Sequence, residues 1–382
     1  MKKLIGIFLG AVLLIVACSK SSDNVNPGGG NTGNTFESFD RKGMLTNLGN
    51  NVIIPSFDNF DQKTALLQTA ITTYSTDLSN EQKLILAQSA WIEAIKAWKA
   101  SSVFIQGPIT DKFLVNSIDY QTVSYDNIEK AITEGTTIDN AYVESKGATV
   151  KGFQALEYLL FDQNKKNSNI IGGYTGANGA KRIAYLKALI TNLKEKSALV
   201  LNAWKPSGEN YVAKFISADG RDINSSLGVL VNNLIQLAYT VRDERIGAPY
   251  GHRTNNVPQP NLVDGRLSDI SADLAIAELN SIESALQGKT ATGAKGLGIY
   301  DLLDKLEAKS GSDLLSKVLS DQFTTVYTKI KAIPVPLRLA VVNNPAQVGA
   351  AYDEVKRLQV KLEVDMVNNL GVLLTFSDND GD

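Results

Sequence analysis

Apolar residues recur every three or four positions along most of the chain beyond residue 36, and this spacing predicts amphipathic helices. No segment keeps the strict alternation of apolar and polar residues that predicts a half-buried strand. The pattern therefore predicts an all-α protein. The predicted helices span residues 59–78, 79–98, 151–161, 181–204, 225–243, 268–286, 312–333 and 344–370.

The second of these helices carries Trp91 and Trp98 on its apolar stripe, and we expect both rings in the core. Ser79 heads a capping-box pattern and is the expected cap of this helix. Two stretches between helices are polar and rich in Gly, Asn or Lys, at 162–180 and 206–220. We expect irregular backbone in both, and the first is long enough to form a mobile flap.

One predicted helix, 151–161, is apolar on nearly every side. From Gly152 it reads GFQALEYLLF, in which Gln154 and Glu157 are the polar side chains, three residues apart on one face. A carboxylate without a partner is costly to bury, so Glu157 either pairs inside the protein or lines a wet cleft. The alternative is that both side chains only fix the packing of the helix, by bonding to backbone or to an arginine.

This stretch resembles the signature of the imelysin-like family, which reads Gly-x-His-x-x-Glu and continues into an apolar tail. Gly152 and Glu157 match the two ends of the signature, and Gln154 stands where the family has histidine. Other segments resemble parts of the family in the same order along the chain, so that the resemblance covers residues 43–382. These segments are 45–60, 241–251, 264–271 and 370–382.

The resemblance implies two packed helical bundles, with the motif helix near their junction. We place the N-terminal bundle, which contains the motif, at 36–210 and the C-terminal bundle at 211–382. A boundary in the polar stretch 206–222 suits this division. Packed helices joined by polar loops also agree with the physical logic of helix bundles.

The resemblance also implies a ligand-binding site that combines the motif with other segments. Asp119 would match an aspartate in a loop of the family, and Arg266 falls in a segment that resembles its Arg-x-Ser part. Glu244 and Arg245 are candidates because we expect them at the carboxyl end of a helix, where the helix dipole disfavours acidic side chains. A structural salt bridge would account for that pair equally well. The predicted ligand-binding residues are Gly152, Gln154, Glu157, Asp119, Glu244 and Arg266.

Few residues of the chain suit a metal ion. His252 is the one histidine, in a turn-rich loop where it is either exposed or part of a site, and Cys18 is the one cysteine. An amide oxygen is a weak ligand for zinc and most transition metals, so Gln154 lowers the metal affinity expected of the motif. The predicted metal ligand is Glu157, for iron or another divalent metal held weakly.

The start of the chain has the pattern of a lipoprotein leader. Two lysines precede an apolar run at 4–16, which is short for a membrane span, and the sequence IVAC follows. This predicts a signal peptide at 1–17, cut before Cys18, whose sulfur then carries a lipid; an ordinary signal peptide is the alternative. The polar stretch 18–35 is expected to form a flexible tether. We therefore expect a lipoprotein of the bacterial cell envelope, anchored to the outer membrane.

The net charge of the chain limits the classes of partner that it is expected to bind. The formal net charge is −2, and loss of two lysines with the leader makes it more negative, so no nucleic-acid partner is expected.

The resemblance implies a ligand-binding component of iron or haem uptake, which holds a small ligand or metal in an interdomain cleft. Two alternatives stay open. One is a metallopeptidase, which needs about three protein ligands and a general base. The other is a non-enzymatic scaffold that binds another envelope protein.

Overall fold

The structure is a computed structural model, and it describes residues 32–290, 293–334 and 336–375. The predicted signal peptide, Cys18 and the tether up to residue 31 lie outside the described residues. A helix already begins at Thr32, so the last four residues of the predicted tether are helical. Within the described ranges, no helix is both long enough and apolar enough to cross a membrane.

The protein is all-α, as predicted, and in the described residues its strands are one short antiparallel hairpin. Turns of 3₁₀ or π geometry are marked η. The first fifteen elements are α1 (Thr32–Ser38), α2 (Arg41–Asn47), η1 (Leu48–Ile53), α3 (Ile54–Tyr74), α4 (Glu81–Lys99), η2 (Ser102–Phe104), α5 (Pro108–Asp111), α6 (Leu114–Ile118), α7 (Tyr125–Glu134), α8 (Asn140–Glu144), η3 (Ala148–Val150), α9 (Gly152–Leu160), α10 (Asn167–Thr175), α11 (Gly179–Trp204) and α12 (Tyr211–Ser217).

The rest of the chain forms a second set of helices, which includes the hairpin of β1 (Lys309–Ser310) and β2 (Asp313–Leu314). Its helical elements are α13 (Ser226–Tyr239), η4 (Thr240–Gly247), α14 (Ala248–Tyr250), η5 (Pro260–Leu262), α15 (Ser271–Gln287), α16 (Ile299–Lys305), α17 (Leu315–Lys331), α18 (Leu337–Asn343), α19 (Pro345–Val360), η6 (Lys361–Met366) and α20 (Val367–Leu370).

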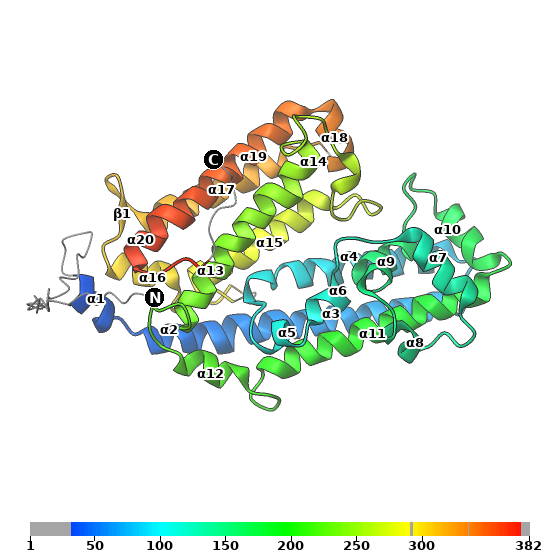
Figure 1. Ribbon diagram of the computed structural model, residues 1–382, viewed down its shortest axis with the longest axis horizontal. Helices are drawn as coiled ribbons and strands as arrows, with labels where there is room; N and C mark the ends of the chain where they lie inside the picture. Colours follow the sequence, from blue (N-terminus) through cyan, green and yellow to red (C-terminus); the bar gives the residue numbers. More distant parts are fainter. Residues whose placement is uncertain (1–31, 291–292, 335, 376–382) are drawn as a thin grey trace, which may run out of the picture.

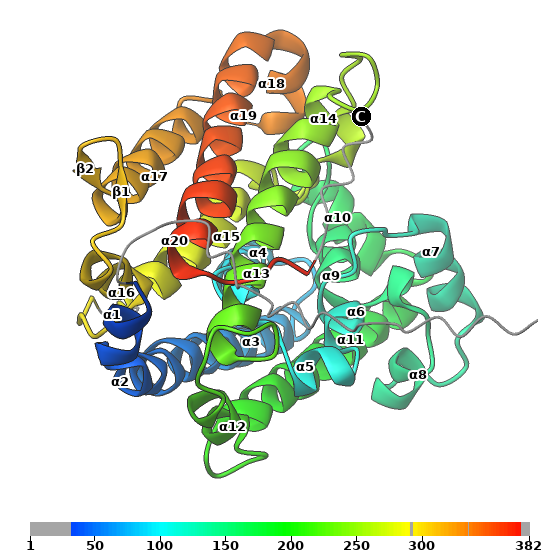
Figure 2. The same ribbon diagram turned by 60° about the vertical axis from the view of Figure 1, so that its left-hand side comes forward.

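The elements pack as two groups of helices. The long helices α3, α4 and α11 lie side by side, with α9 against α4 and α11. The second group contains α13, α15, α17 and α19, which run obliquely to the first group (Figure 1). The groups meet where α15 packs on α4 and α13 packs on η2, and Figure 2 shows this junction from another side.

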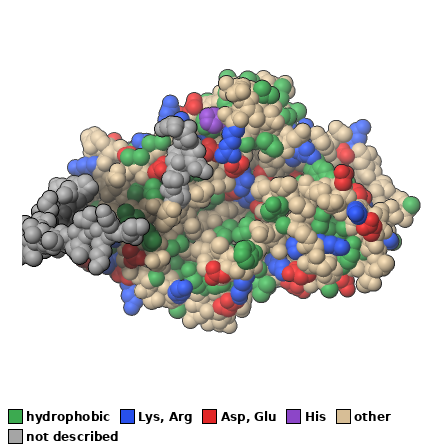
Figure 3. Space-filling model, in the orientation of Figure 1, with side chains coloured by type: hydrophobic (Ala, Val, Ile, Leu, Met, Phe, Trp, Pro, Cys, Tyr) green, Lys and Arg blue, Asp and Glu red, His purple; other side chains and the backbone are tan. Residues whose placement is uncertain are grey.

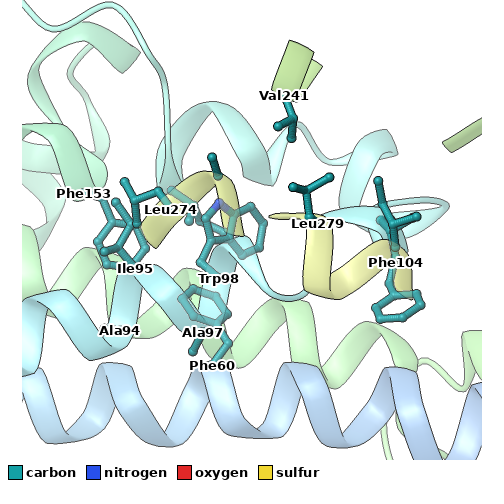
Figure 4. Close-up of a cluster of buried hydrophobic side chains, with 14 of the residues drawn as sticks. Phe60, Ala94, Ile95, Ala97, Trp98, Phe104, Phe153, Val241, Leu274 and Leu279 are labelled. Carbon is teal, nitrogen blue, oxygen red and sulfur yellow. The ribbon is translucent and has the colours of Figure 1, made fainter. Parts of the chain in front are cut away.

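Buried apolar side chains run without a break from one group into the other. Figure 4 shows Phe60 and Trp98 of the first group near Leu274 and Leu279 of the second. The rings of Phe60 and Trp98 have centroids 5.0 Å apart, and both tryptophans of α4 are buried, as predicted. Because the core is shared, side chains at the junction are held from both sides.

Two predictions of irregular backbone are wrong. The stretch 162–180 contains α10, which is anchored by the buried side chains of Ile170 and Tyr174, and 206–220 contains α12, anchored by Val212 and Phe215. Tertiary packing overrides the weak helix propensity of these polar, glycine-rich sequences. Helix α12 packs on α2 and η1 of the first group.

The cap of α4 also differs from the prediction. Oδ1 of Asn80 accepts a hydrogen bond from the backbone N–H of Lys83 at 3.1 Å, so Asn80 caps the helix. The hydroxyl of Ser79 instead donates to Oδ1 of Asp77 at 2.8 Å. Both residues are good N-caps by type, so spacing alone could not choose between them.

Candidate functional site

A lysine side chain lies at the junction of the two groups, almost out of reach of water. Lys99 ends α4 and is 1 % exposed. Its ammonium lies 2.7 Å from Oδ2 of Asp119, 2.7 Å from Oδ2 of Asp264 and 3.4 Å from Oε1 of Glu278. Burial alone would lower the pKa of Lys99, but these three carboxylates outweigh it and raise the pKa. Lys99 is therefore a permanent internal cation.

Arg245 supplies the second cation of this cluster. Its Nε and Nη2 donate to both oxygens of Glu278 over 2.8–3.1 Å, and Nη1 donates to Oε1 of Gln121 at 3.0 Å. Burial favours the neutral form of Asp264, yet Lys99 and Arg245 lower the pKa of that carboxyl to about 2. Two buried cations thus face three buried carboxylates.

The predicted place of Arg245 and Glu244 at a helix end is wrong. The π-helical η4 continues α13 directly into α14, so both residues lie within a helix that ends at Tyr250. The dipole argument for them therefore fails. Glu244 forms a half-exposed ion pair with Arg253 at 2.6 Å, which agrees with the salt-bridge alternative for that residue.

Gln154 of α9 reaches into the cluster. Its amide nitrogen donates to Oδ1 of Asp119 at 3.0 Å and to Oδ1 of Asp264 at 3.2 Å. A primary amide has two N–H groups, so Gln154 can serve both aspartates at once. No described residue donates a hydrogen bond to its oxygen, Oε1.

Gly152 is the first residue of α9, and it allows this helix to lie close to the backbone just before Asp119. It has a φ of +72°, and a Cβ there would lie 2.4 Å from the carbonyl oxygen of Ile118. Only glycine combines this backbone conformation with that distance. The structure gives Gly152 a packing role, and its predicted role in ligand binding stays a prediction.

Glu157, one turn further along α9, is 3 % exposed. Its Oε1 accepts from the backbone N–H groups of Leu267 and Ser268 at 3.1 and 2.8 Å, and from the Ser268 hydroxyl at 2.6 Å. Burial raises the pKa of Glu157 to about 7, although these donors favour the ionised form. Among the described residues nothing donates to Oε2. One oxygen of Glu157 is thus fully paired and the other is not.

A cavity of about 780 Å³ opens next to these side chains. Gln154, Glu157, Glu244, Arg245 and Arg266 all contribute to its wall, so four of the predicted ligand-binding residues meet here. A second hollow of about 410 Å³ lies on the other side of Arg245, which lines both. Volumes of this size are typical of small-molecule sites.

The other candidates from the sequence lie outside this wall. Asp119 accepts a hydrogen bond from Gln154 but does not line the larger cavity; it lines the smaller hollow instead. His252 is exposed, packs its ring 4.8 Å from that of Tyr352, and lines neither cavity. The histidine is visible at the surface in Figure 3, where acidic and basic side chains are mixed across the face.

Sequence reasoning did not single out Lys99, Asp264 and Glu278. Glu278 could have been found, because it interrupts the buried stripe of α15 between Leu274 and Ile282. A charged side chain in an otherwise apolar stripe needs a buried partner. Lys99, which directly follows the buried Trp98, carries a weaker form of the same signal.

The residues present do not form a complete metal centre. In the described part of the chain, no group of three or more His, Cys, Asp or Glu side chains is placed to hold a metal ion. Asp119 and Asp264 direct oxygens at the ammonium of Lys99, which occupies the place between them. Glu157 can offer a single oxygen, and a metal there would need most of its ligands from elsewhere.

Replacing Glu157 with glutamine should change how stability depends on pH. The pKa of Glu157 rises from 4.5 in the unfolded chain to about 7, so the stability it contributes is complete below pH 4.5 and lost as the pH rises to 7. The side chain introduced by Glu157→Gln is neutral at every pH, so this variant does not lose stability in that way. The unfolding free energy of Glu157→Gln relative to wild type should therefore increase by about 3 kcal/mol across this window. Urea denaturation at several pH values measures it, and a constant difference would contradict it.

Comparison with known proteins identifies relatives of the chain. The family model described as Imelysin matches residues 53–363. A crystal structure of an iron-regulated protein A precursor from Parabacteroides distasonis ATCC 8503 matches with a TM-score of 0.72 and 17 % identity, over 90 % of this chain and 97 % of that one. An imelysin-like protein from Psychrobacter arcticum 273-4 matches with a TM-score of 0.69 and 16 % identity, over 90 % and 98 %. At these identities the likeness shows the fold. No curated protein matches the chain.

Proposed function

Because the chain belongs to the imelysin family, we propose that it is a lipid-anchored protein of the bacterial cell envelope that binds an iron-bearing small ligand or haem for uptake. The name of one structural neighbour, an iron-regulated protein A precursor, agrees with an iron-related role. The lipid anchor at Cys18 is supported by the leader pattern of the sequence, and we propose the outer membrane as its location.

The observation that carries the proposal is the group of polar side chains in the wall of the larger cavity. Gln154 and Glu157 each keep one oxygen, Oε1 and Oε2, to which no described residue donates, and both side chains belong to this wall, as do those of Arg245 and Arg266. The cluster behind the wall fixes Gln154 through Asp119 and Asp264 and fixes Arg245 through Glu278. A rigid cavity with a few oriented polar groups is typical of a small-molecule site.

The geometry favours iron that arrives with its own ligands. Glu157 and Gln154 together leave two oxygen atoms free, which is fewer than a bare iron ion needs. An iron chelate brings the remaining ligands and needs recognition mainly at its periphery. A haem would be held without an imidazole ligand, since His252 lies outside the cavity. The peptidase alternative gains no support, because no three ligating side chains meet in the described residues.

Replacing Glu157 with alanine should weaken iron binding strongly. The probes are ferric citrate, haemin and a ferrous salt, each dialysed against the full chain in detergent and followed by iron analysis. We expect saturable retention of at least one probe by wild type, and a loss of roughly tenfold or more in Glu157→Ala, because a charge-assisted contact is removed.

The control is Glu93→Ala, which removes an exposed carboxylate paired with Lys63 and should bind as wild type. Circular dichroism checks that both variants are folded. If no probe is retained by wild type, or if Glu157→Ala retains iron as wild type does, the proposed function is wrong. Incorporation of labelled palmitate into wild type but not into Cys18→Ser tests the anchor in the same preparations.

A further inference from the structure

Arg266 is a partly buried cation in the cavity wall with neutral partners. Its Nη1 donates to Oδ1 of Asn261 at 3.0 Å, and Nη2 donates to the hydroxyl of Tyr125 at 2.9 Å. Arg245 in the same wall is paired with Glu278, but no carboxylate of the described chain forms an ion pair with Arg266. A guanidinium placed in this way retains most of its capacity to bind an anion.

The segment that carries Arg266 is fixed on both sides. Asp264 is held by Lys99, and Ser268 is held by Glu157. On the far side, Asp269 forms ion pairs with Lys165 at 2.9 Å and with Arg338 at 2.8 Å.

The aromatic partner of Arg266 is fixed as well. The ring of Tyr125 stacks on that of Tyr158 with centroids 4.5 Å apart, and the guanidinium of Arg266 lies 5.3 Å from the Tyr125 ring. An arginine held in this way loses little conformational freedom when it binds a ligand, which lowers the cost of binding.

The part of the cavity wall formed by Gln154 and Glu157 favours the opposite kind of ligand group, a hydrogen-bond donor. Gln154 and Glu157 are 7 % and 3 % exposed, both line the cavity, and each keeps one oxygen to which no described residue donates. Both oxygens are open to the cavity and lack a protein donor, so a ligand group that donates a hydrogen bond can pair with them. The cavity thus has an anion-binding side at Arg266 and a donor-accepting side at Gln154 and Glu157.

We propose that the cavity binds a hydroxycarboxylate, whose carboxylate pairs with Arg266 and whose hydroxyl donates to the free oxygens of Gln154 and Glu157. The inference rests on the proposed function for the role of this ligand, and it deepens that function by naming the chemical class. Carboxylate oxygens are also hard donors that suit ferric iron. A hydroxycarboxylate with more than one carboxylate can therefore carry iron on the carboxylates that do not face Arg266, while its hydroxyl keeps the proton that it donates.

Titration calorimetry of the full chain in detergent with metal-free citrate tests the proposal. We expect wild type to bind citrate and Arg266→Gln to bind it roughly 10- to 100-fold more weakly, since a charge-assisted pair is lost. Arg266→Lys keeps the charge but loses the planar fork, so its affinity should fall between the two. Arg357→Gln, which removes an exposed arginine of α19 paired with Glu354, should bind as wild type.

Two pairs of ligands test the hydroxyl. Tricarballylate is citrate without its hydroxyl and should bind more weakly than citrate. Glutamate is 2-hydroxyglutarate with an ammonium group in place of the hydroxyl and should bind more weakly than 2-hydroxyglutarate. The proposal is overturned if wild type does not bind citrate, if Arg266→Gln binds it as wild type does, or if either analogue binds as tightly as the hydroxycarboxylate with which it is compared.

The outcomes separate this inference from the proposed function. Retention of iron without binding of metal-free citrate would leave the proposed function intact and overturn the hydroxycarboxylate. Binding of metal-free citrate without retention of iron from any probe would support the ligand class and overturn the iron role.

Discussion

Replacing Lys99 with methionine is expected to lower the free energy of unfolding by about 3–5 kcal/mol, because it leaves buried carboxylates without their central cation. Asp119 and Asp264 each lie 2.7 Å from the Lys99 ammonium and would lose their closest positive charge. Arg245 cannot take over, since it is bound to Glu278 and lies 3.8 Å from Asp264. Methionine nearly preserves the volume, so the loss reports on charge rather than on packing.

Urea denaturation of wild type and Lys99→Met at neutral pH measures this effect. The matched control is Lys63→Met, which removes a lysine of a surface pair with Glu93 and should change stability by less than about 1 kcal/mol. The deficit of Lys99→Met should shrink under acidic conditions, where the orphaned carboxyl groups take up protons. Equal stabilities of the two variants at neutral pH would show that the cluster is not held by Lys99.

Replacing Gly152 with alanine should destabilise the fold by about 2–5 kcal/mol and disturb the site as well. At a φ of +72°, an alanine is strained, and its Cβ would lie 2.4 Å from the carbonyl oxygen of Ile118 and 2.8 Å from that of Ser117. These are backbone atoms at the end of α6, so the strain can be relieved only by moving that end of the helix and the loop after it. That movement carries Asp119 away from Gln154, and ligand binding should fall together with stability.

Thermal unfolding and iron retention of Gly152→Ala test this prediction together. Gly147→Ala is the matched control, because its backbone φ is −67° and no atom lies within 4 Å of the added Cβ. That control should be as stable as wild type or slightly more so. A Gly152→Ala protein with wild-type stability would mean that α9 and the Asp119 loop do not need their close approach.

The sequence was most informative where the information is local. The spacing of apolar residues predicted the long helices, and the nearly continuous apolar surface of 152–161 predicted a buried helix with Gln154 and Glu157 on one face. The two readings of Glu157, a partner inside the protein or a wet cleft, both describe the structure. One oxygen is paired with the segment at Ser268, and the side chain lines the cavity.

The sequence was least informative where partners are distant. Lys99 meets Asp264 and Glu278 from more than 150 positions away, and no spacing rule reports such a contact. Helix α10 was missed because Asn167–Thr175 has a poor helix propensity, which burial of its apolar side chains outweighs. The place of Arg245 was misjudged for a related reason, since a π-helical segment does not interrupt a helix in the way a terminus does.

The ammonium of Lys99 has a consequence for how the folded protein forms. Many binding proteins order their ligating carboxylates only when the metal arrives, because the bare carboxylates repel one another. Here Lys99 supplies a positive charge among Asp119, Asp264 and Glu278, so the repulsion between these carboxylates is offset within the folded chain itself. Under the proposed function, the side chains of the cavity wall are then already in place before an iron-bearing ligand arrives.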